Sequence, residues 1–281
     1  MRWRRLDFLR TGTQSAQMTA YYNDNDKHAV AVLKQAISDG VIAPGEVDER
    51  SIKEVQPDDL RGFTQCHFFA GAGCWAVAAR QAGWADDRPL WTGSCPCQPF
   101  SIAGRRKGYA DERHLWPSFF RLISECRPPI CVGEQVAGKI GLEWFAGVRA
   151  DMEECGYACG GADLCAAGVG APHRRQRIYW VANANSEGRQ ARYDETEKMG
   201  YRNPTVAEGD RGFWSGFEAH QGDDGALRRS GPGIFPVAHG VAGRSEMLRL
   251  VGNSIVIPLA AEFLGAVMKI KRQGTQRSAE R

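Results

Sequence analysis

The sequence predicts an α/β fold in which helices cover both faces of an open sheet. Short apolar segments alternate with amphipathic helical segments from residue 20 to residue 182, which is the pattern of alternating strands and helices. One predicted strand is followed by Gly71-Ala72-Gly73, a turn that lets the backbone approach a ligand at a helix N-terminus. Acidic and reactive side chains recur where the predicted strands end, and open α/β sheets bind ligands at that edge.

Length and composition are those of an ordinary globular protein with reduced cysteines. The 281 residues can bury one sizeable core and a small second lobe. The net charge of +3 is weakly basic and does not by itself indicate nucleic-acid binding. No apolar run is long enough to cross a bilayer, and the start of the chain lacks the apolar segment of a secretory signal. The nine cysteines are an odd number without paired zinc-site spacing, so we expect free thiols and no metal.

Two acids follow the first predicted strand. A short strand at residues 20–22 precedes a helix at residues 27–38, which Asp26 can cap. Asp24 and Asp26 thus stand at a strand end, where an ionised carboxylate can bind a ribose diol. The alternative role, helix capping alone, explains the presence of Asp26 well and that of Asp24 less well.

A cysteine follows the strand after the glycine turn. A strand at residues 65–69 and a helix at residues 74–82 flank the turn, and the next strand ends near Gly93. Cys97 comes soon after it and stands with Gln98 between two prolines, which fix the backbone and remove two hydrogen-bond donors. A thiol at a strand end, before a cationic loop, is where such a sheet would hold a nucleophile for an anionic substrate. A buried structural cysteine is the alternative.

A glutamate at the end of the following strand is a candidate acid. A helix at residues 115–126 leads to a strand at residues 130–133, and Glu134 stands at the end of that strand. Apolar neighbours would desolvate this carboxyl, raise its pKa and let it donate a proton. The alternative is a helix cap for the segment that starts near Lys139.

Two arginines follow near the end of the sheet. A helix at residues 142–155 and a strand at residues 157–164 precede a turn that runs into a strand over residues 170–182. Arg175 and Arg177 alternate there, so on a strand they point the same way. The alternative is that the two arginines lie on an edge exposed to solvent.

Five short motifs stand in consistent positions along the chain. They are Phe69-Ala70-Gly71-Ala72-Gly73, Pro96-Cys97-Gln98-Pro99-Phe100-Ser101, Glu134-Gln135-Val136, His173-Arg174-Arg175-Gln176-Arg177 and Gly252-Asn253-Ser254. Together they resemble the motifs of the DNA (cytosine-5) methyltransferase family, in its phage and prophage form. The sequence departs from the family pattern at His67, Cys74, Gln135 and His173, where the family has an acid, a glycine, an asparagine and a glutamine.

The resemblance implies a DNA (cytosine-5-)-methyltransferase with a Rossmann-like class I methyltransferase sheet. S-adenosyl-L-methionine would donate the methyl group to C5 of a cytosine flipped out of double-stranded DNA. Cys97 would bond covalently to C6, and Glu134 would stabilise the adduct at N3. Arg175 and Arg177 would hold O2. The implied cofactor-binding residues are Phe69, Ala70, Gly71, Gly73, Asp24, Asp26, Asp48 and Asn253. The implied DNA-binding residues are Gln98, Ser101, Arg105, Arg106 and Lys107.

The resemblance and the changes in composition together divide the chain. Residues 18–182 and 250–270 would form the catalytic domain, in which residues 259–269 are helical. Residues 183–249 would form a small irregular target-recognition lobe with Phe213, Trp214 and Phe217 as its core. Residues 1–17 would be a disordered arm, with Met18 as an alternative start, and residues 271–281 a frayed tail.

The resemblance also carries expectations about partners. We expect a monomer that acts on nucleoid DNA in the cytoplasm without a membrane, as restriction-modification enzymes do. The alternative is a catalytically inactive DNA-binding relative. The recognition sequence stays open.

The order of two segments departs from the family's usual order. In the family, the ribose-binding and adenine-binding strands follow the glycine turn, and each strand–helix unit needs about 30 residues. No such length separates Gly83 from Leu90. We therefore predict a permuted chain in which the strands that carry Asp24 and Asp48 come first but still lie beside the glycine strand. Asp48 is the first choice for the adenine contact, and Glu46 is the second.

Overall fold

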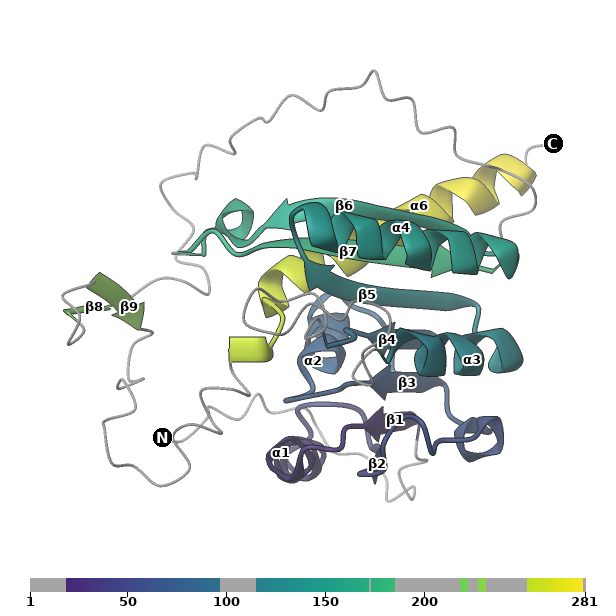
Figure 1. The fold of residues 1–281 in the computed structure, drawn as a ribbon, viewed down its shortest axis with the longest axis horizontal. Helices are drawn as coiled ribbons and strands as arrows, with labels where there is room; N and C mark the ends of the chain where they lie inside the picture. Colours follow the sequence, from purple (N-terminus) through teal and green to yellow (C-terminus); the bar gives the residue numbers. More distant parts are fainter. Residues whose placement is uncertain are drawn as a thin grey trace.

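Seven strands form one sheet in the order β2-β1-β3-β4-β5-β7-β6 (Figure 1). The computed structural model describes residues 19–96, 115–171, 173–184, 218–221, 227–230 and 252–279. Strands β1 to β5 run parallel, whereas β7 pairs antiparallel with both β5 and β6. The strands are β1 (Ala20–Asn23), β2 (Gly45–Asp48), β3 (Gln65–Phe68), β4 (Leu90–Gly93), β5 (Ile130–Val136), β6 (Ala158–Cys165) and β7 (Gln176–Asn183).

Helices cover both faces of this sheet (Figure 1). One face carries α3 (Trp116–Cys126) and α4 (Lys139–Glu154), and the other carries α1 (Lys27–Ser38), α2 (Cys74–Gln81) and α6 (Ile257–Ala279). Successive strand residues alternate between the two layers: Trp91 of β4 packs with α3 and α4, and Leu90 packs with α2 and α6. Every residue of β1, β3 and β4 is buried, as expected for parallel strands covered on both faces. The predicted α/β fold with a Rossmann-like sheet is confirmed.

Local signals in the sequence set several element ends. Asp26 caps α1 as predicted, because its Oδ1 accepts hydrogen bonds from the backbone N–H groups of His28 and Ala29 at 2.8 and 3.4 Å. At its other end, α3 stops at Arg127, which has a left-handed φ of 52°. Pro128 and Pro129 follow and cannot continue a helix.

Strand β5 and helix α4 are longer than the sequence predicted. β5 continues through Val136, because β7 pairs with it as far as Val136–Arg177. Glu134 therefore lies within the strand rather than after it. α4 begins at Lys139, since Gly138 with a φ of 95° makes the turn that precedes it.

Helix α6 also extends beyond the predicted end at Lys269. It continues through Ala279, and the expected frayed tail at residues 271–281 stays a prediction. No proline follows Pro258 in the sequence, and the Lys, Arg and Gln residues of this stretch are good helix formers.

The predicted recognition lobe is described only in part. A two-stranded antiparallel hairpin, β8 (Glu218–Gln221) and β9 (Leu227–Ser230), lies within residues 183–249. The predicted lobe core (Phe213, Trp214 and Phe217) and the predicted arm at residues 1–17 lie outside the described residues. Among the described helices, none combines the length and the apolar character that crossing a membrane requires.

Candidate active site

Asp24 lies against the glycine turn, at the carboxyl edge of the parallel strands. The Gly71 N–H group donates to Asp24 Oδ2 at 2.8 Å, and the Ala70 N–H group donates to the carbonyl oxygen of Asn23 at 3.0 Å. Gly71 and Gly73 have φ values of 56° and 75°, which glycine adopts without strain. Strands β1 and β2 precede β3 in the chain; β1 pairs with β3, and β2 pairs with the other side of β1. This arrangement brings an acid and a glycine turn together at one edge.

Phe69, which precedes the glycine turn, has an unusual backbone conformation. Its φ is 51°, in a region that few residues other than glycine occupy. Backbone strain of this kind concentrates at functional sites. Its ring packs edge-on against Phe119 with the centroids 6.1 Å apart, and the residue is only partly buried. Part of its surface is therefore accessible beside the turn.

Asp48 is held by protein donors on both carboxylate oxygens. Its Oδ1 accepts from the backbone N–H of Arg50 at 2.8 Å and from Arg50 Nε at 3.1 Å. Its Oδ2 accepts from Tyr21 Oη at 2.6 Å and from Arg50 Nη2 at 2.6 Å. Burial alone would raise the pKa of Asp48, but the hydrogen bonds from Arg50 and Tyr21 outweigh it and lower the pKa. A contact to adenine would have to displace one of these donors, so the predicted role of Asp48 stays a prediction.

Two other acids near this edge have simpler surroundings. Glu46 is exposed on β2. Asp26 caps α1, and its backbone N–H donates to Asp24 Oδ1 at 2.9 Å. Asp26 therefore supports the position of Asp24, whereas its own contact with a cofactor stays a prediction.

Glu134 forms a nearly buried ion pair with Arg177. Arg177 Nε lies 2.9 Å from Glu134 Oε1, and the two side chains are 23% and 10% exposed. Burial raises the pKa of Glu134, and the positive charges of Arg177 and Arg175 offset this rise only in part. A glutamate with a raised pKa can hold and donate a proton near neutral pH. The alternative that Glu134 caps α4 is wrong, because Gly138 is the N-cap and receives no side-chain hydrogen bond there.

The position of Arg175 in the fold differs from the one that the sequence predicted. β7 begins at Gln176, so Arg175 precedes the strand, with a left-handed φ of 30°. Strand alternation therefore does not explain why it shares a side with Arg177. Instead, Arg175 Nη2 donates to the carbonyl oxygen of Ser254 at 2.8 Å, which ties it to the segment before α6. Asn253, in that segment, is exposed.

The chain that leads to Cys97 is described as far as Pro96. Trp75 Nε1 donates to Ser94 Oγ at 3.0 Å, and Gln135 Nε2 donates to the carbonyl oxygen of Cys95 at 3.3 Å. The predicted nucleophile Cys97 and the predicted DNA contacts Gln98, Ser101, Arg105, Arg106 and Lys107 lie outside the described residues.

The histidine that stands in place of a family acid belongs to the core. His67 is 1% exposed, stacks on Tyr22 with centroids 5.1 Å apart, and lies 2.9 Å from Thr92 Oγ1 through Nδ1. Gln65 Nε2 donates to the carbonyl oxygens of Ala85 and Arg88, so its Oε1 accepts from the other ring nitrogen of His67. Burial lowers the pKa of His67 to about 3. The ring is neutral and structural.

Metal ligation finds no support in the described part of the chain. There, no group of three or more His, Cys, Asp or Glu side chains is arranged to hold an ion. The cysteines of the described ranges are free thiols.

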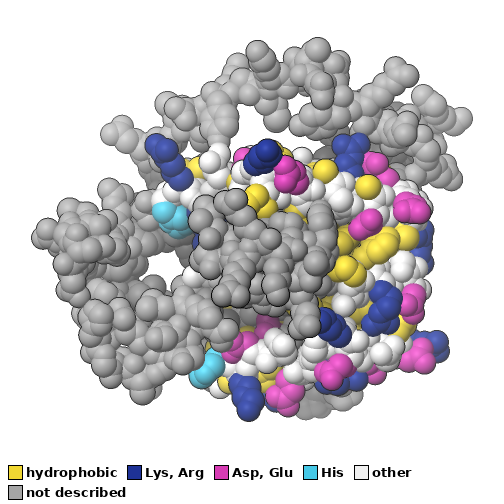
Figure 2. Space-filling model, viewed as in Figure 1, with side chains coloured by type: hydrophobic (Ala, Val, Ile, Leu, Met, Phe, Trp, Pro, Cys, Tyr) yellow, Lys and Arg dark blue, Asp and Glu magenta, His cyan; other side chains and the backbone are white. Residues whose placement is uncertain are grey.

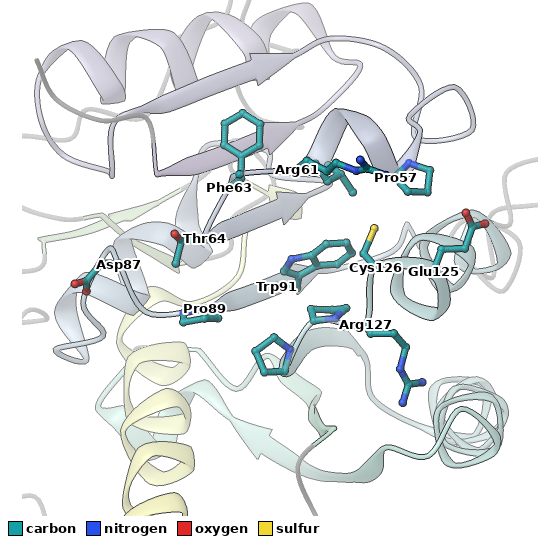
Figure 3. A pocket seen from close by; sticks show the side chains of 14 residues that line it. Pro57, Arg61, Phe63, Thr64, Asp87, Pro89, Trp91, Glu125, Cys126 and Arg127 are labelled. Atoms are coloured by element: carbon teal, nitrogen blue, oxygen red, sulfur yellow. The ribbon is translucent and has the colours of Figure 1, made fainter.

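A cavity of about 660 Å³ lies at the opposite, amino edge of the sheet (Figure 3). Residues just before β3, β4 and β5 form it, namely Thr64, Pro89 and Pro129, and the Trp91 ring lies at the centre of its lining. Its charged residues have both signs: Arg61, Asp87, Glu125 and Arg127. None of the predicted site residues lines it, so it is separate from the acids and arginines described above.

Sequence reasoning missed the side chains that support the candidate residues. Tyr21 and Arg50 hold Asp48, and Trp75 and Gln135 hold the segment before Cys97. The Asp-x-Arg spacing of residues 48–50 was a local signal for the first group. Trp75 gave no such signal, because its partner is 19 residues away in the chain.

The carboxyl edge of the sheet therefore combines Asp24 at the glycine turn with a second polar group, the Glu134–Arg177 pair. The sequence model of the C-5 cytosine-specific DNA methylase family matches residues 7–209. Since this match covers more than half of the chain, the protein belongs to the C-5 cytosine-specific DNA methylase family. The permutation of its first two strands relative to the family's usual order stays a prediction. No curated protein matches the chain.

Several solved structures are similar to this chain at low identity. A variant of Spodoptera frugiperda DNMT2 is 19% identical with a TM-score of 0.39, over 60% of this chain and 43% of its own. S. pombe Dnmt2 is 18% identical with a TM-score of 0.38, over 61% and 52%. A putative DNA modification methyltransferase encoded within an E. coli prophage is 22% identical with a TM-score of 0.39, over 58% and 39%. This chain thus spans about half or less of each of these proteins, and such scores carry no weight for function.

Proposed function

We propose that the protein transfers a methyl group from S-adenosyl-L-methionine to C5 of cytosine in double-stranded DNA. The observation that carries this proposal is the Glu134–Arg177 pair, which joins β5 to β7. β5 lies next to β4, the strand that leads toward Cys97. Asp24 and the glycine turn lie along the same sheet edge. Family membership supplies the reaction class, and this edge supplies groups of the right chemistry.

The residues at the glycine turn fit an adenosine-containing cofactor. Asp24 offers a carboxylate that can accept hydrogen bonds from a ribose diol. A Cβ atom added at Gly71 would meet no heavy atom within 4 Å, so the turn faces open space. Phe69, partly exposed beside the turn, would pack against the cofactor. S-adenosyl-L-methionine, when bound, would supply a methyl group on a positively charged sulfur.

The polar site would activate the cytosine. The Cys97 thiolate would add to C6 of the base, and the electron pair of the C5–C6 double bond would then form a bond from C5 to the methyl carbon. The bond from that carbon to the donor sulfur would break, with its electron pair left on sulfur, so that S-adenosylhomocysteine would leave. Glu134, whose pKa is raised by burial, would hydrogen-bond or protonate N3, and Arg177 would hold both Glu134 and O2. A base then removes the C5 proton, the double bond re-forms, and Cys97 leaves.

The target base must leave the duplex for this chemistry. Figure 2 shows Lys and Arg side chains beside Asp and Glu side chains over the described elements on the side in view. The proposed phosphate contacts are Arg105, Arg106 and Lys107, in the segment after Cys97. We further propose that the protein acts as a monomer on DNA in the cytoplasm.

Transfer of a labelled methyl group to genomic DNA tests the proposal. The wild-type protein should label cytosine, and Cys97→Ala should abolish labelling while it binds S-adenosylhomocysteine as the wild type does. Bisulfite sequencing of the product DNA would then give the recognition sequence. A wild-type protein that binds DNA but never labels it would instead be the inactive DNA-binding relative.

A further inference from the structure

The segment before Cys97 leaves the sheet where β4 ends. β4 pairs with β5 only at Trp91–Cys131 and Thr92–Val132. Residues 94–96 follow β4 without strand pairing. Among the described residues, no strand faces the last residues of β5 on this side, although β7 pairs with them on the other side. Their position relative to residues 94–96 must therefore come from side chains.

Gln135 supplies one of these connections. The residue is 2% exposed. Its Nε2 donates to the carbonyl oxygen of Cys95 at 3.3 Å, and its Oε1 accepts from the backbone N–H of Val136 at 2.9 Å. Both ends of the amide are thus fixed, which also determines its orientation. Gln135 adjoins Glu134 in β5, so it links the candidate acid to the segment before the candidate nucleophile.

Trp75 supplies the second connection, from the cofactor side. It lies in the first turn of α2, two residues after Gly73 of the glycine turn, and is 5% exposed. Its Nε1 donates to Ser94 Oγ at 3.0 Å. Its ring packs edge-on against Tyr179, with the centroids 5.9 Å apart. Tyr179 faces Glu134 in the β5–β7 pairing. Trp75 therefore connects the helix that follows the glycine turn with strand β7 and with Ser94.

We propose that Trp75 and Gln135 are positioning residues that hold residues 94 and 95 and so set where Cys97 begins its attack. This inference rests on the proposed function. Consecutive Cα atoms are about 3.8 Å apart, so the Cα of Cys97 lies within about 7.5 Å of the Cα of Cys95 in any conformation. Fixing Ser94 and Cys95 therefore limits the position of the thiol. Because Trp75 belongs to the helix that follows the glycine turn, it also links cofactor binding to that position.

Four variants and two matched controls test this role. Trp75→Phe keeps the ring and removes the indole donor, Ser94→Ala removes its acceptor, and Gln135→Met keeps the length and removes the amide. Trp84→Phe and Gln65→Met are the controls. Trp84 Nε1 donates to the carbonyl oxygen of Arg88, and Gln65 Nε2 donates to the carbonyl oxygen of Ala85, both away from residues 94–96. The fourth variant combines Trp75→Phe with Ser94→Ala.

The first readout is steady-state kinetics of methyl transfer. Trp75→Phe and Gln135→Met should each lower kcat about tenfold, which corresponds to one buried hydrogen bond. The KM for DNA and the Kd for S-adenosylhomocysteine should stay within about twofold, because neither side chain binds those ligands. The double variant should match Trp75→Phe, since both changes remove the same hydrogen bond. If the kcat of the double variant instead fell by the product of the two single effects, the assignment of that hydrogen bond would be overturned.

The second readout is amide hydrogen exchange of Ser94 and Cys95, which needs no methyl transfer. Exchange should become faster in the Trp75, Ser94 and Gln135 variants and stay unchanged in both controls. S-adenosylhomocysteine should slow this exchange in the wild type but no longer in Trp75→Phe. Unchanged exchange in all three variants, or equal acceleration in the controls, would overturn the proposal. An inactive wild type that shows this exchange pattern would refute the proposed function and leave the positioning role standing.

Discussion

Replacing Arg177 with Met should destabilise the protein in a pH-dependent way. Arg177 Nε lies 2.9 Å from Glu134 Oε1, which gives a gross attraction of about 6 kcal/mol at an effective dielectric constant of about 20. Desolvation offsets much of this, and removal of one partner of a buried pair costs about 3–5 kcal/mol. Since Arg177 is 23% exposed, we expect the lower end, about 3 kcal/mol, at pH 8.

The sign of the pH dependence follows from the pKa of Glu134. That pKa is raised in the folded protein, so the folded state binds the proton more tightly than the unfolded state does. The contribution of Glu134 protonation to the free energy of unfolding is therefore complete below the unfolded-state pKa of about 4.3. It is lost as the pH rises through the folded-state pKa. Without Arg177 the folded pKa rises further, and the loss at high pH grows. A protonated carboxyl needs no counter-charge, so the destabilisation should shrink as the pH falls from 8 to 5.

Urea unfolding at pH 5, 6.5 and 8 measures this effect. Arg149→Met is the matched control, because Arg149 lies 2.7 Å from Glu153 while both side chains are nearly half exposed, and such surface pairs contribute less than about 1 kcal/mol. In a Glu134→Gln background, Arg177→Met should lose most of its effect at pH 8. Equal destabilisation at all three pH values, or an undiminished effect of Arg177→Met in the Glu134→Gln background, would refute this reasoning.

Three further substitutions probe the cofactor edge and the core. Asp24→Asn should weaken S-adenosylhomocysteine binding about tenfold in calorimetry, because a neutral acceptor replaces a charged one. Asp26→Asn keeps a good helix cap and should change the affinity much less. Equal losses of affinity would contradict the assignment of Asp24 to the cofactor. Gly133→Ala should lower the unfolding free energy by about 2–3 kcal/mol, because its Cβ would lie 2.4 Å from a carbonyl oxygen of the facing strand, while Gly160→Ala, with no heavy atom within 4 Å, should be nearly neutral. The pKa of His67, about 3, lies below its unfolded value of about 6.5, so stability should fall as the pH drops below about 6.5, by at most ~1.4 kcal/mol per pH unit. His67→Gln should remove that component, and parallel pH curves for the two proteins would argue against a neutral buried ring.

Local signals in the sequence predicted much of the fold. The bounds of α1 were predicted from its apolar face and from the Asp26 cap, and both are confirmed. The strand-end acid Asp24 and the glycine turn were expected to meet, and Gly71 N–H donates to Asp24. These features depend on residues close together in the chain or on the rule that parallel strands share a carboxyl edge.

Features that depend on distant parts of the chain were not predictable. The length of β5 depends on pairing with β7, which comes 40 residues or more later. The hydrogen bond that Asp48 accepts from Tyr21, 27 residues earlier in the chain, is another such contact. Arg175 was placed on a strand because its spacing from Arg177 fits one, yet its φ of 30° takes it out of the strand. Hydrophobic period and spacing do not encode such contacts.

The most direct test of the account is covalent capture of the proposed adduct. Random-sequence duplexes that contain 5-fluorocytosine in place of cytosine would be incubated with the protein and S-adenosyl-L-methionine. Fluorine at C5 cannot leave as a proton does, so the bond between Cys97 and C6 should persist, and mass spectrometry should find the base joined to the peptide that contains Cys97. A wild-type protein that labels ordinary DNA but forms no such adduct, or an adduct that persists in Cys97→Ala, would contradict the account.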